Sequence, residues 1–102
     1  MITVLFYLSG KEGKEAQLRE LLGEMTRVSR AEDQAVSYVF MQQRDHRSEW
    51  ALFEQWRDRA HLDAHVASMK QHFGEPPPGA RLPARLHELT ASCRAQFYHV
   101  LA

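Results

Sequence analysis

The sequence predicts an α+β fold with a four-stranded antiparallel sheet and two long helices on one face. Three observations support this prediction. Strand-like and helix-like runs follow one another along 102 residues, the two central runs suit a hairpin, and 44% of the residues are hydrophobic. A chain of this size can bury one core, but it cannot also build a large cofactor domain.

The first two elements are a strand and an amphipathic helix. The strand Ile2 to Leu8 carries hydrophobic residues on both of its faces. The helix runs from Lys14 to Arg30, because hydrophobic residues recur there at helical spacing. They form one stripe, made of Leu18, Leu21, Leu22, Met25 and Val28.

A hairpin and a second helix come next. Val36 to Gln43 and Trp50 to Arg57 alternate as strands do, and the polar turn Arg44 to Ser48 joins them. Asp58 is placed to cap a helix that runs from Arg59 to about Phe73. Its predicted buried stripe consists of Leu62, Val66, Met69 and Phe73.

The last third of the chain contains an insertion and the final strand. Three consecutive prolines between Gly74 and Gly79 end the second helix. A short helix from Pro83 to about Thr90 and a strand from Arg94 to Leu101 follow. The complete order of elements matches the split βαβ arrangement of ferredoxin-like domains.

Both faces of the predicted sheet are hydrophobic, although two helices can cover only one of them. A monomer would then expose a larger apolar patch than soluble monomers usually tolerate. We therefore expect a homodimer through the sheet faces, in which two sheets form a dimeric α+β barrel. The alternative is that some of these side chains lie on ragged edges of the sheet.

Composition argues against several function classes. The net charge is zero, so no excess of basic residues is available to bind nucleic acid or an anionic membrane. No run approaches the ~20 apolar residues of a membrane span, and no signal segment opens the chain, so a cytoplasmic protein is expected. Cys93 is the single cysteine and is interpreted as inert. Common phosphate-loop, dinucleotide, zinc-protease and serine-hydrolase motifs are absent.

His61, His65 and His72 lie close together on a helical wheel, beside the predicted buried stripe. They could be boundary residues whose rings pack and whose nitrogens bond water or carbonyls. Alternatively, His65 could accept a proton, since an imidazole with a pKa near ~6.5 exchanges protons at neutral pH. Zinc binding by His61 and His65 lacks an obvious third ligand, so no metal site is expected.

Glu54 shares a strand face with hydrophobic side chains. An ionised carboxylate in that position must find a partner or raise its pKa. The partner could be an arginine such as Arg57 or Arg59, or Glu54 could lie near a sheet edge. Strand aromatics could line a flat pocket, although such residues are also typical of cores. They are Phe6, Tyr38, Phe40, Trp50 and Trp56.

The segment EQWRDRAHLDAHVASMKQHF, from Glu54 to Phe73, resembles the antibiotic biosynthesis monooxygenase (ABM) family of small dimeric α+β barrel proteins. That family shows Glu-x-Trp after a strand and Leu-x-x-His in the next helix. The matching residues are Glu54, Trp56, Leu62 and His65. The segments VSYVFMQQRD and ITVLFYLSGKEGKEAQL are also similar, so residues 1–102 are expected to form one ABM-like domain. The insertion at residues 74–91 departs from the family pattern.

The resemblance implies a homodimer and, in active members, oxygenation of phenols or quinols without metal, flavin or haem. Such chemistry suits a small domain, because an electron-rich phenolate can itself supply electrons to dioxygen. We therefore expect a cofactor-independent monooxygenase for a small aromatic quinol or phenol. His65 is expected to act as the base, with Glu54 and Tyr38 orienting the substrate. The expected substrate contacts are Trp56, Phe6, Trp50, His61, Met69, His72 and Phe73.

Two alternatives remain open at this point. The chain could be a non-catalytic dimeric module that binds a hydrophobic metabolite, or a haem-binding or haem-degrading relative. The haem-degrading subgroup of the family uses a strand Asn together with a Trp and a His. This chain has Phe6 and His65 where a crude alignment places that Asn and Trp. This difference argues against a haem-degrading function.

Overall fold

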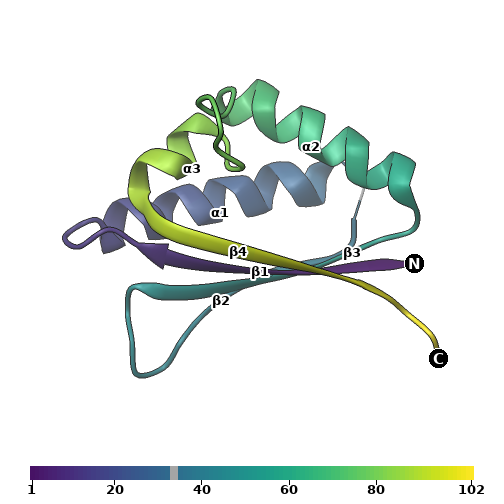
Figure 1. Cartoon of the computed structure of the whole chain (residues 1–102), viewed down its shortest axis with the longest axis horizontal. Coiled ribbons are helices and arrows are strands. Elements are labelled where there is room, and N and C mark those ends of the chain that lie inside the picture. Colours follow the sequence, from purple (N-terminus) through teal and green to yellow (C-terminus); the bar gives the residue numbers. More distant parts are fainter. Residues whose placement is uncertain (33–34) are drawn as a thin grey trace.

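A computed structural model describes residues 1–32 and 35–102 of the chain. The helices and strands follow the predicted order (Figure 1). Their bounds are β1 Ile2–Gly10, α1 Glu15–Ala31, β2 Ala35–Gln42, β3 Glu49–Trp56, α2 Arg59–Phe73, α3 Ala84–Leu89 and β4 Thr90–His99. In the described part of the chain, no helix is both long enough and apolar enough to cross a bilayer.

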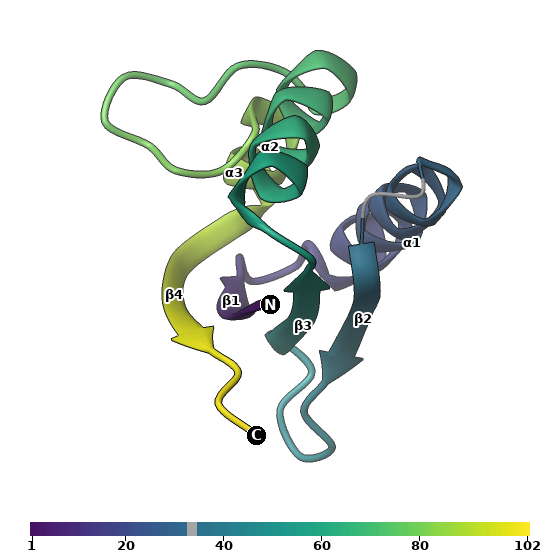
Figure 2. The same cartoon turned by 90° about the vertical axis from the view of Figure 1, so that its right-hand side faces the viewer.

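The four strands form one antiparallel sheet in the order β2-β3-β1-β4. This order is that of a ferredoxin-like domain, so the predicted fold class is confirmed. β1 is central, and its Phe6 lies opposite Leu52 of β3 and Ala95 of β4. All three helices lie on the same side of the sheet (Figure 2).

The final strand begins at Thr90 rather than at the predicted Arg94. No loop separates it from α3, because Thr90 ends that helix and starts the strand. Its hydroxyl donates to the carbonyl of Leu86 at 2.6 Å, and its backbone N–H donates to the carbonyl of His87. These two bonds satisfy carbonyls that would otherwise be unpaired at the helix end.

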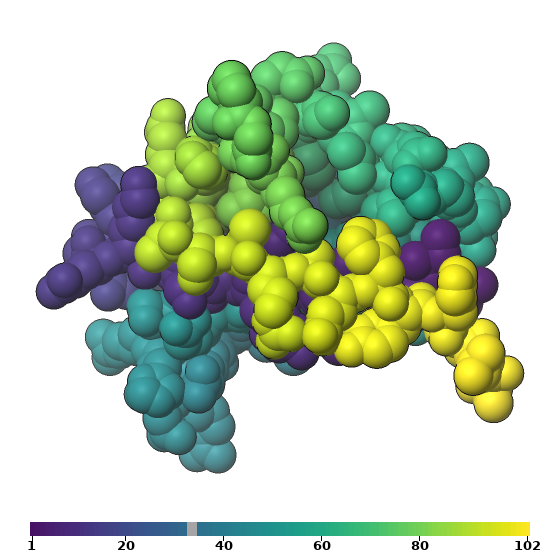
Figure 3. Space-filling model, in the orientation of Figure 1, coloured from purple at the N-terminus to yellow at the C-terminus, as the bar shows by residue number. Residues whose placement is uncertain are grey.

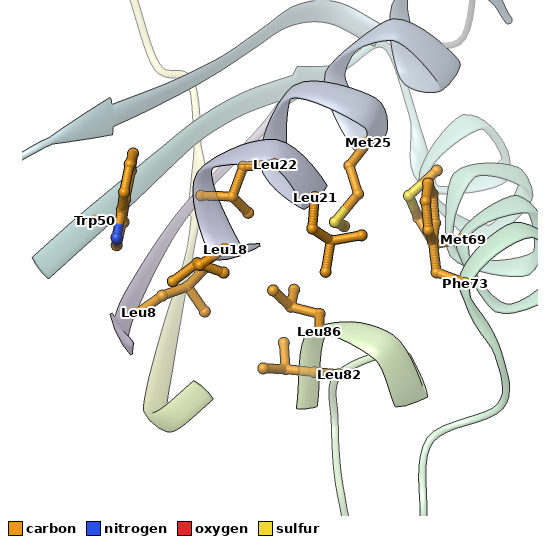
Figure 4. Packing of buried hydrophobic residues seen from close by; sticks show 10 residues of the cluster. All are labelled: Leu8, Leu18, Leu21, Leu22, Met25, Trp50, Met69, Phe73, Leu82 and Leu86. Carbon is orange, nitrogen blue, oxygen red and sulfur yellow. The ribbon is translucent and has the colours of Figure 1, made fainter. Parts of the chain in front are cut away.

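The core lies between the sheet and the helices and has two parts. The larger part gathers hydrophobic side chains from α1, α2, α3 and two strands (Figure 4). It also includes Leu82 of the insertion, whose side chain is 5% exposed. The insertion is therefore anchored in the core. The smaller part surrounds Trp56 and contains Val4, Tyr38, Leu52 and Leu62.

Helix α2 begins as predicted but buries a different face. The Asp58 side chain caps it by accepting a hydrogen bond from the backbone N–H of His61. The prediction that Val66 is buried is wrong, since its side chain is 43% exposed. His65 is 6% exposed and takes that place, between Leu62 and Met69. This spacing of three and four residues keeps one continuous stripe towards the sheet.

The sheet face opposite the helices is hydrophobic and is left uncovered by the chain itself (Figure 2). Strand alternation and register place Leu5, Tyr7, Val39, Met41 and Phe53 on this face. Val39 is 40% exposed and Met41 is 46% exposed. We call these five residues the open face.

Candidate active site

A cavity of about 140 Å³ lies between the sheet and the helix layer. Strands β1 to β4, all three helices and the insertion contribute to its lining. Most of the lining is hydrophobic and includes Val4, Phe6, Leu52, Leu62, Met69 and Leu86. Apolar cavities of about 150 Å³ are known to hold benzene, so this space matches one aromatic ring.

Tyr38 enters the cavity from β2, where strand alternation turns it towards the helices. Its ring meets Phe40 edge-on, with centroids 5.6 Å apart, and lies 5.4 Å from the His65 ring. Its buried hydroxyl has no hydrogen-bond partner among the described residues. Burial raises the pKa of Tyr38 above its usual range, so the phenol stays protonated and can donate a hydrogen bond.

Glu54 enters from β3, next to Tyr38 in the register of the sheet. Its Oε1 accepts a hydrogen bond of 2.9 Å from the Trp56 indole Nε1. Burial raises the pKa of Glu54 to about 7, although the bond from Trp56 opposes the rise. The carboxyl group therefore changes its charge near neutral pH.

This environment corrects both ordinary explanations offered for Glu54. Its partner is an indole rather than an arginine, and Arg59 instead pairs with Asp63 at 3.0 Å. Glu54 also does not lie on an edge strand, because β3 has β1 on one side and β2 on the other. The side chain is buried, with 5% of its surface exposed.

His65 closes the cavity from the α2 side. Its ring stacks on Trp56, with centroids 4.4 Å apart and planes at 35°. Burial lowers the pKa of His65 to about 4, because the charged imidazolium is disfavoured away from water. The imidazole is therefore neutral at pH 7, which is the form that can accept a proton.

The structure brings a subset of the predicted site residues to this cavity. The residues that line it are Phe6, Tyr38, Glu54, His65 and Met69. Trp56 does not line it, but it is fully buried beneath it and contacts both Glu54 and His65. Trp56 therefore touches two of the lining side chains without lining the cavity itself.

The predicted contacts Trp50 and Phe73 lie elsewhere. Both are buried in the larger core, and Trp50 lies on the opposite side of that cluster from Met69 and Phe73 (Figure 4). Because a strand rises about 3.3 Å per residue, Trp50 is about 20 Å along β3 from Trp56. The two tryptophans share a strand face but cannot share a small site.

The three predicted histidines are also separated. His61 turns towards the start of its helix, where its Nδ1 lies 2.6 Å from the Asp58 carboxylate. His72 is exposed, and its Nδ1 lies 2.9 Å from the carbonyl of Ser68. Local hydrogen bonds thus hold His61 and His72 away from the cavity, while packing buries His65.

Zinc binding by His61 and His65 was the remaining alternative for the histidine stripe. Within residues 1–32 and 35–102, no three His, Cys, Asp or Glu side chains are grouped as metal ligands. His61 faces Asp58 and His65 faces Trp56, so the two rings do not converge on one point. Structural and catalytic zinc sites need at least three converging protein ligands.

Several residues of the cavity were not predicted from the sequence. They include Val66, Lys70, Phe97 and, from the insertion, Pro76, Arg81, Leu82 and Pro83. Phe97 had a usable signal, because alternation in β4 and its pairing with Val4 put it on the helix side. The insertion had none, since its path depends on long-range packing.

The fold and the cavity define a class of protein: a ferredoxin-like α+β domain with a ring-sized apolar cavity between sheet and helices. The model of one family, described as "Antibiotic biosynthesis monooxygenase", matches residues 1–75. The chain therefore belongs to the antibiotic biosynthesis monooxygenase family. The match ends at the start of the insertion, and no curated protein matches the chain.

Several solved structures share this fold. A crystal structure of an antibiotic biosynthesis monooxygenase is 18% identical, with a TM-score of 0.82 over 100% of both chains. Rv0793 from Mycobacterium tuberculosis is 26% identical, with a TM-score of 0.79 over 99% of this chain and 95% of that one. A mutant of SnoaB, a cofactor-independent oxygenase from Streptomyces nogalater, is 12% identical, with a TM-score of 0.76 over 97% of this chain and 91% of that one.

Proposed function

We propose that this protein is a cofactor-independent monooxygenase that oxidises a small aromatic quinol or phenol with dioxygen. One observation carries the proposal: a ring-sized hydrophobic cavity holds three polar groups, from Tyr38, Glu54 and His65. Small-molecule sites typically combine an apolar wall with a few convergent polar groups that fix orientation. A planar ring with one or two hydroxyl groups is the complement of such a wall.

The proposed base is His65, with Glu54 supporting it. The neutral imidazole accepts the proton of the substrate hydroxyl and produces an electron-rich phenolate. Burial makes the imidazole a weak base. Glu54 supports it as a second polar group of the cavity, because its carboxyl group ionises near pH 7 and can then accept a hydrogen bond from the substrate. The Tyr38 hydroxyl donates a hydrogen bond that orients the substrate oxygen.

The reaction balances without another electron donor. A ring C–H bond of the phenolate and the O–O bond break, and a new C=O bond forms, so the phenol becomes a quinone. One oxygen atom of dioxygen enters the quinone, and the other leaves as water with the two protons released by the substrate. The substrate supplies all the electrons, and the protein binds, deprotonates and orients it.

We further propose that the protein is a homodimer joined through the open face. Its five hydrophobic side chains would otherwise remain in water on one whole side of the sheet. A second copy offers the same surface, which is the condition for a two-fold symmetric contact. The helix-side cavity would then lie away from the contact.

Oxygen uptake with a panel of hydroquinones and phenols tests the activity. We expect wild type to consume oxygen and His65→Ala to be slower by about 100-fold or more, the usual loss for a general base. His72→Ala is the matched control and should keep the wild-type rate, because His72 does not line the cavity.

Two results would count against this function. Equal rates for wild type and His65→Ala would remove His65 as the base. Tight binding of a phenol with no oxygen uptake would instead favour a non-catalytic module that binds a hydrophobic metabolite.

A further inference from the structure

Two cationic side chains lie at the cavity and have no part in the proposed chemistry. Lys70 of α2 and Arg81 of the insertion both line the cavity and are both exposed. Neither is in an ion pair with another residue in the described part of the chain. Among the described lining residues, Glu54 is the single carboxylic acid, and it is deeply buried. The cavity therefore has a neutral or weakly acidic interior and a positively charged mouth.

The backbone around Arg81 is held in place. Leu82, the next residue, is buried in the larger core. The backbone N–H of Ala80 donates to the carbonyl of Pro77 at 2.9 Å, and that of Ala84 donates to the carbonyl of Gly74 at 3.0 Å. In the space-filling view the green segment between α2 and α3 lies against the helices and extends towards β4 (Figure 3). Arg81 is thus presented by an ordered segment rather than by a loose loop.

We propose that the substrate carries a carboxylate on its aromatic ring or on a short side chain, and that Lys70 and Arg81 bind it at the cavity mouth. This inference rests on the proposed function for the phenolic end of the substrate. The planar guanidinium of Arg81 matches the two oxygens of a carboxylate, and the Lys70 ammonium adds a charge from α2. The hydrophobic wall between the mouth and Glu54 accommodates the ring.

The arrangement also selects the orientation of the substrate. A carboxylate placed at the inner end would be buried beside Glu54 and away from both cations, which is costly for a charged group. At the mouth it remains partly hydrated and faces two positive charges. The phenolic hydroxyl then reaches Tyr38, Glu54 and His65.

A pair of ring-matched ligands tests this inference by calorimetry in the absence of turnover. The probes are 4-hydroxyphenylacetate and its neutral amide, 4-hydroxyphenylacetamide, measured anaerobically at low salt. We expect wild type to bind the carboxylate about fivefold to tenfold more tightly than the amide, the size typical of charge-assisted contacts with partly exposed cations. Raising the salt concentration should reduce this preference.

Three single variants locate the preference. Arg81→Gln and Lys70→Gln should each lower the ratio of the two affinities, and the double variant should bring it close to one, with little change for the amide. Arg44→Gln is the matched control. It changes the net charge equally, but Arg44 lies in the turn between β2 and β3 and does not line the cavity. The ratio of the two affinities should be the same in Arg44→Gln as in wild type.

The outcomes separate this inference from the proposed function. The carboxylate site would be overturned if wild type bound both probes with equal affinity. It would also be overturned if Arg44→Gln lowered the ratio of the two affinities as much as the Arg81 and Lys70 variants do. Either result would leave the phenol site standing. Failure of both probes to bind would also overturn the carboxylate site. A retained carboxylate preference without oxygen uptake would support the site and count against the monooxygenase activity.

Discussion

Glu54 and His65 are buried beside the same indole, yet burial moves their pKa values in opposite directions. The folded carboxyl group titrates near 7 instead of 4.5, and the folded imidazole titrates near 4 instead of 6.5. Each group therefore makes the folded state less stable in the pH range where the unfolded chain would carry its charge. For Glu54 this range opens above pH 4.5, and for His65 it opens below pH 6.5.

The two contributions predict opposite pH dependences for two variants. As pH rises from 4.5 to 7, unfolding releases a proton from Glu54 in wild type, which lowers stability. The free energy of unfolding of Glu54→Gln, relative to that of wild type, should thus rise by about 3 kcal/mol over this range. As pH rises from 4 to 6.5, the destabilisation of wild type by its buried His65 disappears. The free energy of unfolding of His65→Gln, relative to that of wild type, should thus fall by about 3 kcal/mol.

Urea unfolding at several pH values measures both effects. Gln71→Ala is the control, and its stability relative to wild type should vary little with pH, because that side chain is exposed and does not titrate. Parallel pH dependences of the Glu54 and His65 variants would contradict the assigned pKa directions.

At the level of elements, the insertion is part of the folded core rather than a loose connection. It leaves α2 at Gly74, whose backbone has φ 95° and ψ 149°, a conformation almost restricted to glycine. A Cβ atom at this position would lie 3.0 Å from the Cβ of Ala84, where the chain returns. The insertion also carries Gly79, which has φ 80° but open space around it.

The two glycines form a matched pair for mutagenesis. Gly79→Ala should lower the free energy of unfolding by about 1 kcal/mol, because it adds backbone strain alone. Gly74→Ala should lower it by about 2–4 kcal/mol, since the methyl group also crowds Ala84. Denaturant titration measures both values. Equal losses would mean that the contact between Gly74 and Ala84 does not constrain the insertion.

At the scale of the whole molecule, the open face is a hydrophobic side of the sheet that the chain itself leaves uncovered. The three helices cover one side of the sheet and the cavity lies under them, so the other side is free to contact a second copy. The exposed side chains of Val39 and Met41 belong to β2, an edge strand. A charge there would be desolvated in a sheet-to-sheet contact but would remain hydrated in a monomer.

Sedimentation equilibrium tests the dimer. Wild type should sediment as a dimer. The double variant Val39→Glu/Met41→Glu should have a dimer dissociation constant at least about tenfold higher, because its two added charges would be buried without partners in the contact. Val66→Glu is the control, since Val66 has similar exposure but lies on the helix side. A monomeric wild type would reject the proposed contact.

Much of the architecture was predictable from local patterns. Side chains that alternate or recur at helical spacing specified four strands, two long helices and their order, because these periods follow from backbone geometry. The family motif Glu54, Trp56, Leu62 and His65 was likewise readable, since it lies within one strand and the following helix. The hydrophobic open face was also predictable, as each strand has apolar residues at odd and even positions.

Other features depended on contacts between distant parts of the chain. Periodicity could not choose between His65 and Val66 as the buried residue of α2, because packing on Trp56 makes that choice. It could not separate Trp50 from Trp56, which share a strand face. Arg81 lines the same cavity as Lys70, because Leu82 anchors the insertion in a core built from other elements. Burial, pKa values and cavity shape arise from such long-range packing, so local sequence patterns do not specify them.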